Sequence, residues 1–468
     1  MTTVRVRRPG AAALAAAAAL LGTGLLGPAT AASAAPQAPT APKPSPSSSP
    51  AAPALPEGLY GTGDPTYDGV WRQSLAFMAQ QVSGVEPARE SVRWLLDQQC
   101  AGGGFAAYRP APDKPCDDAT VLDTNATAAA VQALAGVEDP EGAEAEKGAP
   151  GQAVKAGASW LKEAQNEDGG WGYNPGSPSD ANSTSIVISA LAATGDRPGD
   201  LVSGTGKTPY DALLGLALPC DAKPGGGAEP GGGAKPGGGA KPGGGAFAYQ
   251  PDKAGKLAAN ADATAAAVLA GLGKDLQTRG VQPQQKPECV TPAKPAIERA
   301  ARNGAAYLAG ALAKNGHLEQ PPLPGAEESA PMPDFGNTAD AVIALSAAGA
   351  TEEAQPALEW LEKNAEGWAD QGGPAAYAQL VLAAHAAGAD ARAFGGTDLV
   401  ARLNATGPQP ATAPTPEAAA TDQGSTREEG NGDEEGDGIN TGVVVGSFLV
   451  AGIGIGFLIS GRGRNRTP

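Results

Sequence analysis

Asp123-Thr-Asn125-Ala-Thr127 opens a short cassette that recurs as Asp180-Ala-Asn182-Ser-Thr184 and Asn260-Ala-Asp262-Ala-Thr264. A Gly-rich turn with one large aromatic residue precedes each copy, and a run of small residues ending in glycine follows it. Asn337-Thr338-Ala339 is a fourth copy that keeps the asparagine and shifts the threonine. Such internal self-similarity predicts a fold built from stacked units.

The spacing of the copies gives the length of one unit. Asn125 and Asn182 are 57 residues apart, Asn182 and Asp262 are 80 apart, and Asp262 and Asn337 are 75 apart. Residues 222–245 lengthen the second interval, because they are four tandem Ala-Lys/Glu-Pro-Gly-Gly-Gly hexapeptides; without these 24 residues it is 56. A period close to 57 residues suits two helices and their connections.

Each unit is expected to hold an outer helix, a turn at the rim and an inner helix. Trp-Leu pairs mark outer segments (Trp94-Leu95, Trp160-Leu161), and runs of Ala, Val and Ile mark inner ones. Asp or Asn of the cassette should cap the inner helix, and glycine should close it. Such glycines occur six times: Gly84, Gly136, Gly195, Gly273, Gly349 and Gly388. The predicted fold is all-α, an (α/α)6 toroid of helix-pair repeats over 57–404; an open solenoid of the same units is the alternative.

A longer motif resembles a known family. Trp160-Leu161-Lys-Glu-Ala-Gln165-Asn-Glu-Asp-Gly-Gly170-Trp171 is similar to the QW repeat of squalene and terpene cyclases, and Trp94–Gln99 with Gly102-Gly-Gly-Phe105 is a looser copy. The α/α-toroid superfamily of these cyclases also includes protein prenyltransferase β subunits, complement-type thioester domains and cobalamin carriers of the intrinsic factor and transcobalamin type. The resemblance implies the fold and leaves the function open.

The two ends of the chain predict export and anchoring. Arg5, Arg7 and Arg8 precede an apolar run that leads to Ala32-Ser33-Ala34, the pattern of a secretory signal peptide. Ile439–Ser460 contains 22 residues without a charge, enough to span a bilayer. Three arginines follow this span and are expected to hold the C-terminus in the cytoplasm. The predicted location is the cell membrane, single-pass, with the N-terminal domain outside.

The predicted organisation follows from these segments and the composition between them. It is a signal peptide (1–34), a disordered Pro/Ala/Ser-rich linker (35–56), the toroid (57–404) with its Gly-rich insertion (222–245), a disordered acidic stalk (405–438), a transmembrane helix (439–460) and a short basic cytoplasmic tail (461–468).

Charge and cysteines narrow the possible partners. The chain has a net charge of −17, and six of its basic residues lie at the two ends, so its acidic exterior argues against nucleic acid. Four cysteines on an exported chain favour disulfides. Cys100 and Cys116 lie on one rim and are expected to pair, which leaves Cys220 with Cys289. The second pair requires 274–288 to double back.

Catalytic groups of the toroid enzymes are incomplete here. The cyclase motif Asp-x-Asp-Asp-Thr-Ala has its nearest match at Asn260–Ala265, where Ala263 replaces an acid, and aromatic residues are only 4% of the chain. His317 and His385 lack the neighbours of a zinc site, so we assign no catalytic or metal-binding residue. A carboxylate pair from Asp123, Asp180 and Asp262 would suit glycan hydrolysis on an (α/α)6 barrel. An isoprenoid cyclase or glycan hydrolase is therefore the enzymatic alternative.

A repeated order of outer helix, turn and inner helix brings all inner N-termini to one rim, where they carry partial positive charge. Polar caps and tyrosines gather there and form the predicted ligand site: Asp123, Asn125, Asp180, Asn182, Asn260, Asp262, Asn337, Tyr108, Tyr173 and Tyr249. Helix capping alone is the competing interpretation for each residue.

The resulting functional hypothesis is an extracellular toroid that binds a ligand or a partner without catalysis. No cofactor is required. The cobalamin carriers imply a corrinoid as one ligand, and a partner chain, such as a membrane uptake component or another surface protein, is expected to complete the site. A structural or adhesive surface protein is the third alternative.

Deleting residues 222–245 is expected to leave the midpoint of thermal unfolding within a few degrees, because long loops add little closure entropy. Phe247→Ala is expected to destabilise the protein by about 3–5 kcal/mol, since Phe247 is predicted to be the buried aromatic of its unit. Thermal and denaturant unfolding measure both effects. A tolerant Phe247 together with an unfolding deletion would contradict the repeat assignment.

Overall fold

The computed structural model describes residues 56–138, 149–222, 243–282, 286–320 and 331–411. The chain divides into two compact units, Met1–Ala54 and Leu55–Pro468, and all described residues lie in the second. These residues are mostly helical, as predicted. None of their helices combines the length and apolar character that a membrane crossing requires. The predicted signal peptide (1–34), transmembrane span (439–460) and basic tail (461–468) lie outside the described ranges.

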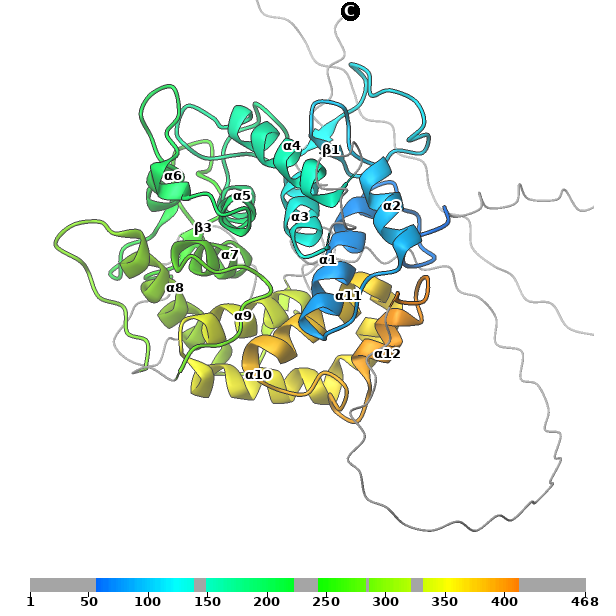
Figure 1. The fold of residues 1–468 in the computed structure, drawn as a ribbon. Coiled ribbons are helices and arrows are strands. Elements are labelled where there is room, and N and C mark those ends of the chain that lie inside the picture. The colour runs from blue at the N-terminus through cyan, green and yellow to red at the C-terminus, as the bar shows by residue number, and fades with distance from the viewer. Residues whose placement is uncertain (1–55, 139–148, 223–242, 283–285, 321–330, 412–468) are drawn as a thin grey trace, which may run out of the picture. The chain divides into compact units, whose positions relative to one another are not determined.

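Six helices form an inner set in which each packs against the next. α1 contacts α3, and the order continues through α5, α7 and α9 to α11, which packs back against α1 (Figure 1). Their bounds are Gly69–Val82, Thr124–Ala135, Ala181–Ala193, Ala261–Gly271, Phe335–Ala347 and Glu366–Ala387. The last of these is two helices joined at a kink at Gly373. The closed order of contacts excludes an open solenoid for this unit.

Six further helices lie outside the inner set. They are α2 (Arg89–Asp97), α4 (Pro150–Glu163), α6 (Pro209–Leu216), α8 (Ile297–Leu312), α10 (Thr351–Asn364) and α12 (Leu399–Asn404). Each packs mainly against the inner helix that precedes it in the chain. Inner helices are dominated by alanine, which allows close approach, and the larger Leu95, Leu161, Leu308 and Leu361 of the outer helices are almost fully buried.

Three two-stranded hairpins precede inner helices at the rim, the end of the unit where the inner N-termini gather. Each is antiparallel: β1 (Phe105–Ala106) pairs with β2 (Leu122–Asp123), β3 (Phe247–Ala248) with β4 (Ala259–Asn260), and β5 (Leu318–Gln320) with β6 (Met332–Asp334). Their registers place Phe105 opposite Asp123, Phe247 opposite Asn260 and Leu318 opposite Asp334. A large apolar residue therefore faces the residue that caps the following helix.

A threonine one turn into the helix joins this apolar residue to the helix. The Thr127 hydroxyl accepts a hydrogen bond from the Phe105 N–H (2.9 Å) and donates to the Asp123 carbonyl (2.7 Å). The same acceptance recurs three times, from Trp171 to Thr184, from Phe247 to Thr264 and from Leu318 to Thr338, at 2.9–3.0 Å. We call these four residues the cassette threonines.

The cassette threonines correct the fourth copy of the motif. Asp334, not Asn337, caps α9, because its side chain accepts the Asn337 N–H (3.1 Å). Thr338 then occupies the same position as Thr127, so the threonine is not shifted. Asn337 lies three residues after the cap, where Ala126 stands in the first copy. The predicted equivalence of Asn337 with Asn125 and Asn182 is therefore wrong.

A glycine two residues before each rim aromatic has a steric cause. Gly103, Gly169 and Gly245 have φ of 95°, 90° and 84°, a left-handed conformation that glycine adopts without strain. A Cβ on Gly103 would lie 2.2 Å from the Ala156 carbonyl oxygen of α4, and one on Gly169 would lie 2.2 Å from that of Thr208. The turn of one unit thus packs directly on the backbone of the next outer helix.

Glutamines of the QW-like motif hold these turns. Gln165 donates to the Gly169 carbonyl (2.8 Å), and Gln99 donates to the carbonyls of Gly103 (2.9 Å) and Ala153 (2.8 Å). Trp171 is buried and donates through Nε1 to the Leu161 carbonyl (2.7 Å). The motif is therefore explained by packing and hydrogen bonding within the described residues.

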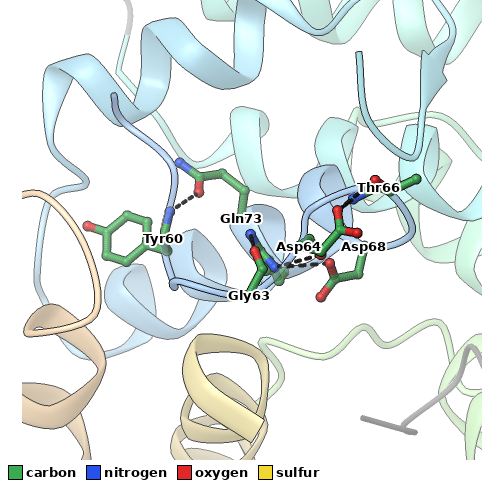
Figure 2. Close-up of polar contacts among 7 residues, drawn as sticks. Tyr60, Gly63, Asp64, Thr66, Asp68 and Gln73 are labelled. Atoms are coloured by element: carbon green, nitrogen blue, oxygen red, sulfur yellow. Dashed lines mark hydrogen bonds and ion pairs between the residues drawn. The ribbon is translucent and has the colours of Figure 1, made fainter. Parts of the chain in front are cut away.

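The two ends of the unit meet beside α1. The Gly61 N–H donates to the Thr406 carbonyl (2.8 Å), and buried Tyr60 donates through its hydroxyl to the Pro408 carbonyl (3.2 Å). The Tyr60 N–H donates to Gln73 Oε1 (2.9 Å), as Figure 2 shows. Residues 405–411 therefore pack on the unit, and the predicted start of the stalk at 405 is too early.

Both predicted disulfides are present. Cys100–Cys116 and Cys220–Cys289 have Cα–Cα distances of 5.7 and 5.6 Å. Five of the six predicted helix-closing glycines have the expected left-handed φ. Gly136 does not: its φ is −91°. A Cβ there would lie 2.5 Å from the Gln81 side chain, so this glycine is required by close packing.

Thr127→Val is expected to lower the free energy of unfolding by about 1–3 kcal/mol, because it leaves the buried Phe105 N–H without its acceptor. Thr124→Val is the matched control. Thr124 is equally buried in the same helix, and its hydroxyl has no hydrogen-bond partner in the described structure. This control should be neutral or stabilising. Denaturant unfolding of both variants measures the difference, and equal costs would contradict the role of the cassette threonines.

Candidate functional site

Three predicted site residues at the rim are helix caps. Asp123 accepts the Ala126 N–H (2.8 Å), Asp180 accepts the Ser183 N–H (2.7 Å) and Asn260 accepts the Ala263 N–H (2.8 Å). Their oxygens satisfy amides that would otherwise attract an anion. Aspartates at these caps also offset the positive ends of the helix dipoles. The rim is therefore not the electropositive surface that the sequence suggested.

Two predicted site tyrosines join neighbouring units. The Tyr173 carbonyl accepts the Thr124 N–H (2.8 Å) and the Tyr249 carbonyl accepts the Ala181 N–H (3.0 Å), so each binds the helix of the preceding unit. Their hydroxyls hydrogen-bond to Asp123 and Asp180. Burial and these carboxylates raise the pKa of both tyrosines. Tyr108 lies in the equivalent place, against Gly69.

The middle residue of the cassette has a different environment. Asn182 and Asp262 come from adjacent inner helices, and the Asn182 amide donates to Asp262 Oδ2 at 2.6 Å. Both line a cavity between the inner helices. Asn125 is buried, and its Oδ1 has no hydrogen-bond partner among the residues described, but it does not line this cavity.

The cavity, which we call the cup, holds about 40 Å³ of water-accessible space. Its walls come from α3, α5, α7 and α9. The lining residues are Gln132, Asn182, Ser185, Ile186, Ser189, Asp262, Ala265, Ala266, Leu269, Leu276 and Asp340. Polar atoms concentrate in it although inner helices are otherwise apolar.

Several cup residues escaped the sequence prediction. Gln132, Ser185, Ser189 and Asp340 line the cup, and the Gln379 amide donates to Asp340 Oδ1 at 2.8 Å. One signal for them was available. Asn182, Ser185 and Ser189 are spaced i, i+3 and i+7, which places polar groups on one face of an apolar helix. Polar residues within a buried helix need a partner or a function.

Residues 274–281 form the floor of the cup. The Lys274 carbonyl accepts from Ser189 (3.0 Å), and Gln277 donates to Gln81 Oε1 (2.9 Å). The N–H groups of Gly280 and Val281 donate to the carbonyls of Ala386 (2.9 Å) and Ser346 (3.2 Å). The floor therefore contacts α1, α5, α9 and α11 near their C-terminal ends. The chain then returns to Cys289, the doubling back that the second disulfide requires.

Burial dominates the electrostatics of the cup. It raises the pKa of Asp340 to about 8 and that of Asp262 to about 7, although Gln379 and Asn182 hydrogen-bond to them. The carboxylates repel each other, and Asp334 adds to the shift of both. Burial also raises the pKa of Asp180 to about 6. None of the residues that line the cup is Lys or Arg.

Metal binding has little support in the described ranges. They contain no group of three or more His, Cys, Asp or Glu side chains placed to hold a metal ion. His317 stacks on Trp360 with ring centroids 4.2 Å apart, away from the residues of the cup.

Comparisons with known proteins give no family. No family model and no curated protein matches the chain. Among solved structures, the crystal structure of a protein from Actinoplanes aligns with 67% of this chain and 99% of its own length, at 15% sequence identity and a TM-score of 0.29. A similarity at this level supports no functional argument.

Asp340→Asn is expected to reduce the pH dependence of stability. A carboxyl whose pKa is raised from about 4 to about 8 binds its proton more tightly in the folded state. Its stabilising effect is fully present below pH ~4 and is lost as the pH rises through ~8. The variant should therefore unfold at a higher temperature than wild type at pH ~8.5, with the difference vanishing or reversing near pH ~4.

Thermal unfolding between pH ~4 and ~9 measures this effect. Asp118→Asn is the matched control, because Asp118 is exposed. Identical pH profiles for wild type and Asp340→Asn would show that Asp340 does not titrate as described.

Proposed function

We propose that this protein is an (α/α)6 toroid of the cyclase and prenyltransferase superfamily, exported and anchored in the cell membrane, that binds a small ligand through the cup without catalysis. One observation carries the proposal. Buried oxygen atoms of Gln132, Asn182, Ser185 and Asp340 line one cavity, and none has a hydrogen-bond partner among the described residues. Buried polar atoms without partners are destabilising, so their concentration in one place indicates a ligand.

The closed inner set supports the toroid assignment, and the two disulfides suit an extracellular location. The floor covers the C-terminal ends of several inner helices, so a ligand is expected to enter from the rim. A corrinoid is far larger than the cup and would rest on the rim, where its carboxamide side chains could donate hydrogen bonds inward. A partner protein in the membrane or at the surface would cover its outer face.

Acid catalysis is the second candidate. The pKa of Asp262 is about 7 and that of Asp340 about 8, so both can hold a proton near neutral pH, as a general acid requires. Size argues against it for isoprenoids and glycans. Sites for ligands of that class have volumes of roughly 300–1,000 Å³, far above the 40 Å³ of the cup. A structural or adhesive role would leave the oxygens of the cup unexplained.

Titration calorimetry of the full-length protein with cobalamin and cobinamide tests the binding proposal. We expect saturable binding that weakens by about 10-fold or more in Asn182→Ala, which removes a group that lines the cup. Asn364→Ala, an exposed amide that bonds only within α10, is the control. Incubation with squalene or wall oligosaccharides tests the alternative. Product that disappears in Asp262→Asn would replace binding with catalysis.

A further inference from the structure

The polar atoms of the cup are arranged with their acceptors toward the cavity. Asn182 uses its N–H group on Asp262 (2.6 Å), and Gln132 uses its own on the Ala128 carbonyl (3.3 Å). These acceptors fix the orientation of both amides. Asn182 Oδ1, Gln132 Oε1 and Asp340 Oδ2 are then left without hydrogen-bond partners among the described residues. What the cup lacks is hydrogen-bond donors.

Charge points the same way. Asp262 and Asp340 line the cup, and Asp180 and Asp334 lie close enough to Asp262 to repel it. No basic residue lines the cup to compensate them. A buried carboxylate without a counter-charge is costly. A cation that donates hydrogen bonds would satisfy both the charges and the unpaired oxygens.

Other ligand classes fit less well. An anion would meet the carboxylates, and the helix amides that could bind it are occupied by Asp123, Asp180, Asn260 and Asp334. Divalent metal ions prefer several carboxylates in one shell, and the described residues offer no group of three acidic or other metal-binding side chains. A primary ammonium carries one compact charge and three N–H donors.

We propose that the cup binds a primary ammonium group between Asp262 and Asp340, with the oxygens of Asn182 and Gln132 as further acceptors. The inference rests on the proposed binding function and names its ligand class. A cavity of about 40 Å³ has room for about three water molecules. It therefore takes the ammonium end of an amine, and the rest of a larger molecule extends through the rim.

Thermal unfolding of the full-length protein with methylammonium chloride at pH ~8.5 tests this assignment. Tetramethylammonium chloride at the same concentration is the control, because it has the same charge and no N–H donor. We expect methylammonium to raise the midpoint by at least ~2 °C, since a ligand that binds the folded state stabilises it. Tetramethylammonium and calcium chloride should have no comparable effect.

Two variants connect the effect to the cup. Asp340→Asn and Asp262→Asn should each weaken methylammonium binding by about 10-fold or more, measured by calorimetry. Exposed Asp118→Asn should leave it unchanged. Equal stabilisation by both ammonium ions, a larger effect of calcium, or binding that survives both variants would overturn the assignment.

Failure of this inference and failure of the proposed function give different results. If a corrinoid binds and the binding depends on Asn182 while methylammonium has no effect, the cup is a binding site for a neutral ligand. If methylammonium binds through both carboxylates and corrinoids do not bind, the ammonium assignment holds without a corrinoid. If no probe binds, both proposals fall.

Discussion

A hydroxyl group one turn into the inner helix fixes how the rim and the helix meet. The cassette threonine accepts the N–H of a buried aromatic or leucine and donates back to the carbonyl of the helix cap. This orients the large side chain between helices and sets where the helix begins. Because the same bond recurs in four units, every inner helix that carries it starts at the same level. The rest of the architecture follows from that common level.

Starting at a common level has a consequence in the centre of the unit. Residues two positions after each cap face one another across neighbouring helices, as the bond between Asn182 and Asp262 shows. Alanine-rich surfaces allow the helices to approach closely and leave a small space. Polar groups that enter it, such as Asp340, lose most of their contact with water. The chemistry of the cup is thus set by burial more than by any single charged pair.

Much of this fold could be predicted from the sequence, because it depends on local signals. Caps, left-handed glycines and the repeat period are written in short motifs. The fourth copy was misaligned because Asn337 matched by residue type, whereas Asp334 fills the capping position. Gly136 was misjudged because its neighbour Gln81 is distant in sequence.

The site was harder to predict for the same reason. Capping residues and cup residues look alike in the motif, and only the contacts between helices separate Asp180, a cap, from Asp262, a cup residue. Asp340 and Gln379 meet across two helices that are 39 residues apart in sequence. No local pattern predicts that pairing, and the masses of alanine around each residue give no register for the helices.

The bridge between Cys220 and Cys289 affects more than the loop it closes. It encloses α7 and the floor in one covalent loop with a sequence separation of 69 residues. The floor is therefore held twice: by hydrogen bonds to the inner helices, and by a bond that persists in an oxidising compartment. In a reduced chain only the hydrogen bonds would retain it. The blind end of the cavity is thus a property that the chain completes outside the cytoplasm, which makes the receptacle a product of export itself.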